Sequence, residues 1–83
     1  MALSFPNPSR SYDGTRHGVW FWGYDKSREI IFLVEDRVLM KFDSALGSDE
    51  AQVLASFDRH RNEILEIAMA VYVEGRQTLY TLH

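Results

Sequence analysis

The sequence has no cysteine and no long apolar run, and each absence excludes a class of protein. Without cysteine among its 83 residues, the chain cannot form a disulfide, use a thiolate nucleophile or bind a metal through cysteine. The longest apolar run, Ile67–Val73, is far shorter than the roughly 20 residues that cross a bilayer. The first ten residues lack the apolar stretch of a signal peptide. We therefore predict no membrane span and expect a cytoplasmic protein.

The residues that are present suit one small folded domain over residues 1–83. Hydrophobic residues make up 46% of the chain and charged residues 25%, a balance that excludes a disordered protein. At this size, folding should bury roughly 64% of the surface of the unfolded chain, which allows a small core. The formal charge of −3 weighs against a general affinity for phosphate backbones.

Both prolines lie near the N-terminus. Pro6 and Pro8, among several polar turn-forming residues, predict an irregular arm over 1–16. Within the arm, Leu3 and Phe5 alternate with a polar residue, a pattern that suits a short extended segment lying on the domain.

Two strongly β-prone segments follow the arm. Val19–Tyr24 and Glu29–Val34 are rich in β-branched and aromatic residues, and the polar residues Asp25–Ser27 separate them. This pattern predicts an antiparallel hairpin over 17–34.

The second half of the chain carries helical signals. Asp36 suits the cap of a short helix over 36–42, and Ser48 suits the N-cap of a long helix over 49–74. Apolar residues recur at helical spacing along the long helix, with a series seven residues apart at its centre: Phe57, Ile64 and Val71.

Together these elements predict an α+β fold. A last strand over 77–82 completes the order strand, strand, helix, helix, strand. We expect a three-stranded, mostly antiparallel sheet packed on one long and one short helix. A continuous helix over 49–74 would be roughly 39 Å long, whereas a domain of this size is about 30 Å across. The long helix must therefore overhang the domain or break.

Both faces of the predicted sheet are apolar. Successive side chains of a strand point to opposite faces, and along the first strand aromatic residues occupy the positions between those expected to face the core. Two helices can cover only one face, so the other needs the N-terminal arm, a second copy or a ligand. The C-terminal half of the long helix adds a second apolar flank. We therefore expect a homodimer, with the interface drawn from these residues: Trp20, Trp22, Tyr24, Leu65, Met69, Tyr72 and Val73.

No catalytic, cofactor or metal signature is present in the sequence. Asp58 and His60 are close in sequence, but residues two apart on a helix point in different directions and cannot readily form a catalytic pair. His17, His60 and His83 share no metal-ligand spacing. We therefore predict that the protein is not an enzyme and needs no cofactor. We expect an interaction or accessory module acting as a homo-oligomer, with an unidentified protein partner left open.

Two other functions remain open. Weak binding of single-stranded nucleic acid, or a regulatory role, is the alternative, because cations lie around a strand rich in aromatic residues that could stack bases. The cations are Arg10, Arg16, Lys26 and Arg28. A small-molecule pocket between helix and sheet would instead be lined by Tyr24, Tyr72 or Tyr80.

Three segments together resemble a known bacterial family. They are Leu3–Pro6, Val19–Gly23 and Phe57–Ile64, the last leading to Tyr72 and Gly75. Over nearly the whole chain the sequence is similar to the family catalogued as domain of unknown function 1488. The resemblance implies a short, stand-alone bacterial protein with a small antiparallel sheet and a long helix. It implies no catalytic residue, because these segments are patterns of packing residues.

Overall fold

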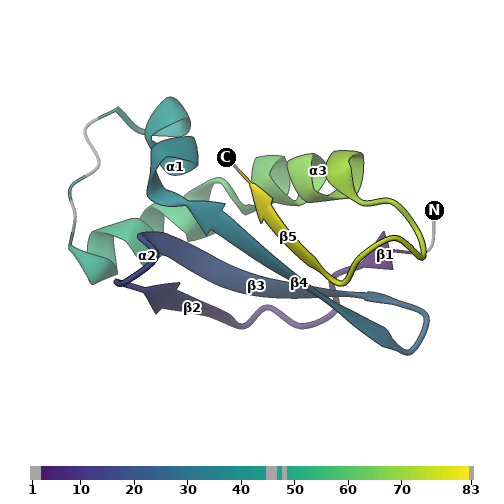
Figure 1. Ribbon diagram of the computed structural model, residues 1–83. Coiled ribbons are helices and arrows are strands. Elements are labelled where there is room, and N and C mark those ends of the chain that lie inside the picture. Colours follow the sequence, from purple (N-terminus) through teal and green to yellow (C-terminus); the bar gives the residue numbers. More distant parts are fainter. Residues whose placement is uncertain (1–2, 45–46, 48, 83) are drawn as a thin grey trace.

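The computed structural model describes residues 3–44, 47 and 49–82 (Figure 1). Its α+β architecture agrees with the predicted class, but the sheet has five strands instead of three. In chain order the elements are β1 (Leu3–Ser4), β2 (Arg10–Asp13), β3 (Gly18–Asp25), β4 (Arg28–Glu35), α1 (Asp36–Phe42), α2 (Glu50–Arg59), α3 (Arg61–Val71) and β5 (Leu79–Leu82).

The sheet is mixed, and β3 and β4 form its centre. They make the predicted antiparallel hairpin, joined by the two-residue turn of Lys26 and Ser27, in which Lys26 has a φ of 59°. β1 and β2 pair antiparallel with opposite ends of β3. β5 pairs with β4 in parallel, because the helices carry the chain back across the sheet before β5 begins.

The N-terminal arm, predicted to be irregular, contributes two strands to the sheet. β1 lies in the short extended segment expected around Leu3 and Phe5, whereas only turn signals were present near β2, which follows the two prolines. Phe5 packs on the helix side of the sheet, with its ring centroid 6.0 Å from that of Phe21 and 5.8 Å from that of Phe32. Gly23 leaves room for this ring, since a Cβ there would lie 2.7 Å from Phe5 Cε1.

The long helix predicted over 49–74 is broken into α2 and α3. His60 lies between them with φ −111° and ψ 22°, and α3 ends at Val71. A continuous helix over 49–74 would be longer than the molecule, whose longest dimension is 36 Å, and the break divides it into two shorter helices. The imidazole of His60 stacks on Phe42 of α1, with the ring centroids 5.2 Å apart. Both helices can therefore lie over the sheet.

The short helix α1 has the predicted bounds, although Asp36 is its first residue and not its cap. Ser48, predicted to cap the following helix, lies outside the described residues. Asp49 caps α2, because its carboxylate accepts a hydrogen bond from the backbone N–H of Gln52 at 3.3 Å.

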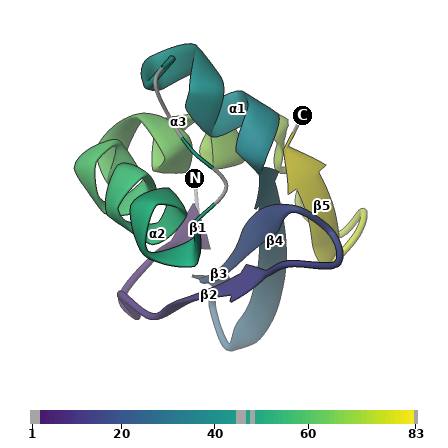
Figure 2. The same cartoon turned by 90° about the vertical axis from the view of Figure 1, so that its left-hand side faces the viewer.

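The helices lie on one face of the sheet, as Figure 2 shows from the side. Beneath them, the rings of Phe21 and Phe32 stack with centroids 5.2 Å apart, and Phe57 of α2 lies 5.3 Å from Phe21. The alternation predicted for the hairpin is confirmed, because its helix-facing side chains are at most 1% exposed: Val19, Phe21, Ile30, Phe32 and Val34.

Candidate interaction surface

The sheet face opposite the helices carries an apolar surface, which we call the open face. It is formed by alternate residues of β3, β4 and β5: Trp20, Trp22, Tyr24, Ile31, Leu33 and Leu79. Trp22 pairs with Ile31, and Ile31 pairs with Leu79, so one apolar row crosses three strands. Trp20 pairs with Leu33 and begins a second row.

Side chains on the open face differ in exposure. Leu33 is only 3% exposed, whereas Leu79 at the sheet edge is 51% exposed. The rings of Trp20 and Trp22 are half-buried. No helix lies over these rings in the part of the chain that the structure describes, so they remain in contact with water. Such a surface is typical of a site that another molecule covers.

A turn between β2 and β3 fixes Trp20. Asp13 Oδ2 accepts a hydrogen bond from the indole Nε1 of Trp20 at 3.0 Å. Asp13 Oδ1 accepts from the backbone N–H groups of Thr15 and Arg16, each at 3.0 Å. The hydrogen bonds from the Arg16 backbone and the Trp20 indole lower the pKa of Asp13. The indole N–H is thus satisfied within the chain, and the rest of the ring is left for packing.

The predicted interface residues of the long helix lie on the other side of the sheet. Leu65 and Met69 are half-buried and pack against the core. Tyr72 is buried in the chain itself, and its hydroxyl donates a hydrogen bond to the buried carboxylate of Asp25. That hydrogen bond raises the pKa of Tyr72. Val73, which is 51% exposed, is the most exposed residue of this group.

The four cations of the nucleic-acid alternative do not form one patch. Arg16 lies before the start of β3 and Lys26 after its end, and a strand of this length spans about 25 Å. Arg28 lies 4.0 Å from the carboxylate of Asp25. Arg10 is bound by a carboxylate of α2, and Arg16 Nε lies 3.8 Å from Asp13 Oδ2, so Lys26 is the one of the four without an ion pair among the described residues.

The Arg10 side chain ties β2 to α2. Its Nε and Nη2 atoms donate to the two carboxylate oxygens of Asp58 at 3.0 and 2.9 Å. Arg61 donates a further hydrogen bond to Asp58 at 3.4 Å. The hydrogen bond from Arg10 is the main reason why the pKa of Asp58 is lowered. The reactive-looking segment around His60 is thus a salt-bridged helix edge.

We expect Asp58→Asn to lower the free energy of unfolding at pH 7 by about 0.5–1 kcal/mol, because the ion pair is partly exposed. The pKa of Asp58 is lower in the folded than in the unfolded chain, so its contribution is present above about 3.9, the unfolded value. The contribution is lost as the pH falls through the folded value. Urea denaturation at several pH values should therefore show the two proteins converging in acid.

The control for this prediction is Glu66→Gln. Glu66 is exposed on α3 and makes no ion pair with another described residue. Its substitution should leave the pH dependence unchanged. A stability difference for Asp58→Asn that persists in strong acid would contradict the assignment to the carboxylate charge.

The family model described as "protein of unknown function (DUF1488)" matches residues 3–83. The chain belongs to this family. The match confirms the resemblance drawn from the arm, the first long strand and the helix segment. A search of curated proteins gives no match.

A solved structure shares the fold of this DUF1488 chain. It is the crystal structure of a protein of unknown function from the DUF1488 family of Shewanella loihica PV-4. The two superpose with a TM-score of 0.77 at 16% sequence identity, covering 98% of this chain and 91% of that one. The similarity supports the arrangement of helices and sheet described above.

None of the helices formed by the described residues of this DUF1488 chain is long and apolar enough to span a bilayer. Within the same residues, no group of three histidine, aspartate or glutamate side chains is placed to hold a metal ion.

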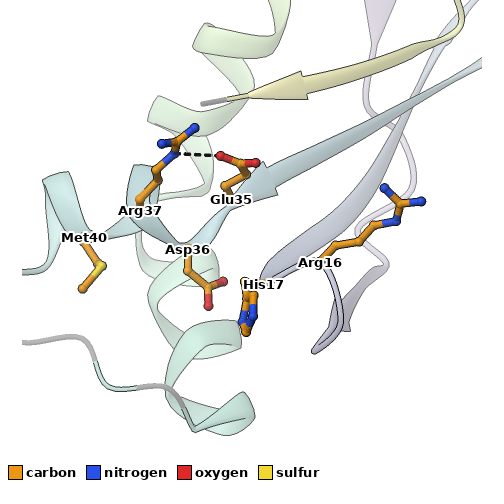
Figure 3. Close-up of a pocket in the computed structure, with 6 residues that line it drawn as sticks. All are labelled: Arg16, His17, Glu35, Asp36, Arg37 and Met40. Carbon is orange, nitrogen blue, oxygen red and sulfur yellow. Dashed lines mark hydrogen bonds and ion pairs between the residues drawn. The ribbon is translucent and has the colours of Figure 1, made fainter.

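A hollow of about 410 Å³ lies where the turn before β3 meets the start of α1 (Figure 3). Arg37 pairs with Glu35 at 2.8 Å across it, and Arg16 points away from the other lining side chains. Asp36 Oδ2 accepts a hydrogen bond from the Tyr12 hydroxyl at 3.3 Å. Burial, followed by the charge of Asp36, raises the pKa of Tyr12. Glu35, Asp36 and Arg37 thus each have a partner within the chain, although Asp36 Oδ1 is buried with no hydrogen-bond partner among the described residues.

Little in the sequence indicates this hollow. Its lining includes His17, whose φ of 54° places it in the left-handed region, where few residues other than glycine lie. The polar turn over 14–17 was visible in the sequence, but its contact with α1 depends on the tertiary fold.

The three tyrosines suggested as a pocket lining lie on different sides of the sheet. Tyr24 is on the open face, and its hydroxyl lies 3.4 Å from Glu29 Oε2. Tyr72 and Tyr80 lie on the helix side, where their rings meet edge to face with centroids 5.8 Å apart. These side chains therefore do not line one cavity.

Proposed function

We propose that this DUF1488 member is a non-enzymatic interaction module that acts in the cytoplasm as a homo-oligomer through its open face. One observation carries the proposal: α1, α2 and α3 all lie on one side of the sheet (Figure 2), while the strand alternation places two tryptophans, Trp20 and Trp22, on the other. The module needs no catalytic group, because its function is to present this surface.

The N-terminal arm does not relieve the exposure of the open face. β1 and β2 extend the sheet beside β3, and Phe5 inserts on the helix side. A second chain is therefore the simplest cover. Burying apolar surface gains about 25 cal/mol per Å², so a patch of several hundred Å² yields several kcal/mol before the cost of association.

The alternative function, weak binding of single-stranded nucleic acid, is favoured by the side chain of Arg16. It is 65% exposed, and its guanidinium lies 5.9 Å from the ring centroid of Trp20. A base could stack on the same ring. Binding of this kind should weaken as salt is added, whereas an apolar contact between copies should not.

Sedimentation equilibrium at high micromolar concentration tests the proposal. We expect the wild type to self-associate, and Trp22→Thr to raise the dissociation constant at least about tenfold, because a large aromatic ring at the centre of an interface carries much of its energy. Threonine keeps the strand propensity of the site. Circular dichroism should show that the variant is folded.

Met40→Gln is the matched control. Met40 is an exposed apolar residue of α1, away from the open face, so its loss should leave self-association unchanged. A wild type that stays monomeric throughout the concentration range would overturn the proposal. Equal effects of the two substitutions would show that apolar surface in general, and not the open face, drives association.

A further inference from the structure

The outer edge of β5 has unpaired backbone groups. β5 ends the sheet, and no described strand lies beyond it (Figure 1). The backbone N–H of Ile31 donates to the carbonyl of Thr78 at 2.8 Å, and Ile31 is in register with Leu79. In a parallel ladder of this register, the N–H and C=O of Tyr80 face β4, and those of Leu79 and Thr81 face outward.

This edge lacks the features that normally prevent strand addition. The strand Leu79–Leu82 contains no charged residue and no proline, both of which natural edge strands use to prevent pairing. The side-chain amide of Gln77 donates to the carbonyl of Leu79 at 2.7 Å and occupies one outward acceptor. The Gln77 side chain is flexible, so a partner strand can displace its amide from the Leu79 carbonyl.

Exposed apolar residues gather beside the same edge. Four large hydrophobic residues are exposed in the described part of the chain: Met40, Val71, Val73 and Leu79. Leu79 belongs to β5. Val73 lies next to β5, because its backbone N–H and C=O bind the hydroxyl of Tyr80 at 3.1 and 3.2 Å. Apolar surface therefore flanks the edge on the open face and at the end of α3.

We propose that β5 is a second contact between copies of this chain, in which two β5 strands pair antiparallel about a two-fold axis at Tyr80. In this register Leu79 of one copy lies opposite Thr81 of the other. The outward N–H and C=O groups of both residues are then paired in both copies. The strand is complementary to itself, which identifies a second copy as the occupant.

The edge contact differs from the contact through the open face. Edge pairing joins two sheets side by side and leaves both open faces uncovered. A chain that has both contacts assembles beyond a dimer, and removing either contact leaves a dimer held by the other. The two proposals can therefore be tested separately.

The decisive experiment uses Trp22→Thr as the background, in which the open-face contact is weakened. We expect this variant to remain a dimer at high micromolar concentration. Adding Thr81→Pro should weaken that dimer at least about tenfold, because proline removes an outward N–H without breaking a bond to β4. Adding Thr81→Ala, which keeps the N–H, should change the dissociation constant less than about threefold.

One further variant keeps the test decisive if proline disturbs the fold. Gln77→Ala should strengthen the dimer severalfold, because the partner strand no longer competes with the amide for the Leu79 carbonyl. A merely structural role for Gln77 would not produce tighter association.

Each outcome decides between the proposals. A monomeric Trp22→Thr variant of an associating wild type overturns the edge contact and leaves the proposed function standing. A dimeric Trp22→Thr variant that is insensitive to Thr81→Pro and to Gln77→Ala also overturns the edge contact. A monomeric wild type overturns both proposals.

Discussion

Phe57→Ala is expected to lower the free energy of unfolding by about 3–5 kcal/mol, the range for deletion of a fully buried aromatic ring. Phe57 is 0% exposed and joins α2 to the sheet, with its ring centroid 5.3 Å from that of Phe21. The guanidinium of Arg61 lies 4.8 Å from the same centroid and would lose its contact with the ring. An 83-residue domain is typically stable by roughly 4–12 kcal/mol, so the substitution should remove roughly a quarter or more of that stability.

Phe42→Ala is the matched control, because the same atoms are deleted from a half-buried site. Phe42 packs on His60 at the edge of the core, and its removal should cost about half as much, since less apolar area returns to water. Urea denaturation with a common m-value measures both changes. Equal losses at the two sites would contradict a core centred on Phe57.

The β3–β4 hairpin and α1 could be predicted because their signals are local. Alternation of apolar and polar positions has a period of two, and the break over Asp25–Ser27 is short and polar. β2 could not be predicted in this way, and for β1 the alternation of Leu3 and Phe5 indicated only a short extended segment. Each strand is held by hydrogen bonds to β3, a partner distant in sequence.

The break between α2 and α3 was foreseen only in part. The length of the segment required an overhang or a break, but no proline or glycine marks its position. His60 is placed by tertiary contacts: it stacks on Phe42, and its neighbour Arg59 pairs with Asp43. These contacts with α1 depend on the path that the chain takes across the sheet. Helical periodicity in the sequence does not predict that path.

The open face follows from the sequence more directly than the contacts around it. Trp20, Trp22 and Tyr24 share a face because strand residues alternate. The placement of Tyr72 did not follow, because its buried partner Asp25 is 47 residues away. The outward orientation of Leu79 and Thr81 was also beyond prediction, since it requires the parallel register between β4 and β5.

Gly18→Ala is expected to lower the free energy of unfolding by about 1–3 kcal/mol, as overpacking does in a close-packed site. A Cβ at this position would lie 2.8 Å from the carbonyl oxygen of Val34 and 2.8 Å from Leu33 Cδ1. The side chain of Leu33 can shift, but the backbone oxygen cannot move without disturbing the pairing of Gly18 with Glu35. The start of β3 should therefore separate from the end of β4.

Gly14→Ala provides the control within the same turn. A Cβ at Gly14 would lie 3.6 Å from the ring of Tyr12, an ordinary contact, so the folded state can accept it. The added methyl also reduces the freedom of the unfolded chain, and the variant should be as stable as the wild type or slightly more stable.

Thermal unfolding followed by circular dichroism measures the stability of the two alanine variants. If the two alanines cost the same, the loss at Gly18 reflects turn flexibility and not the close approach of β4. If only Gly18→Ala destabilises, the close approach of Gly18 to Leu33 and Val34 accounts for the loss.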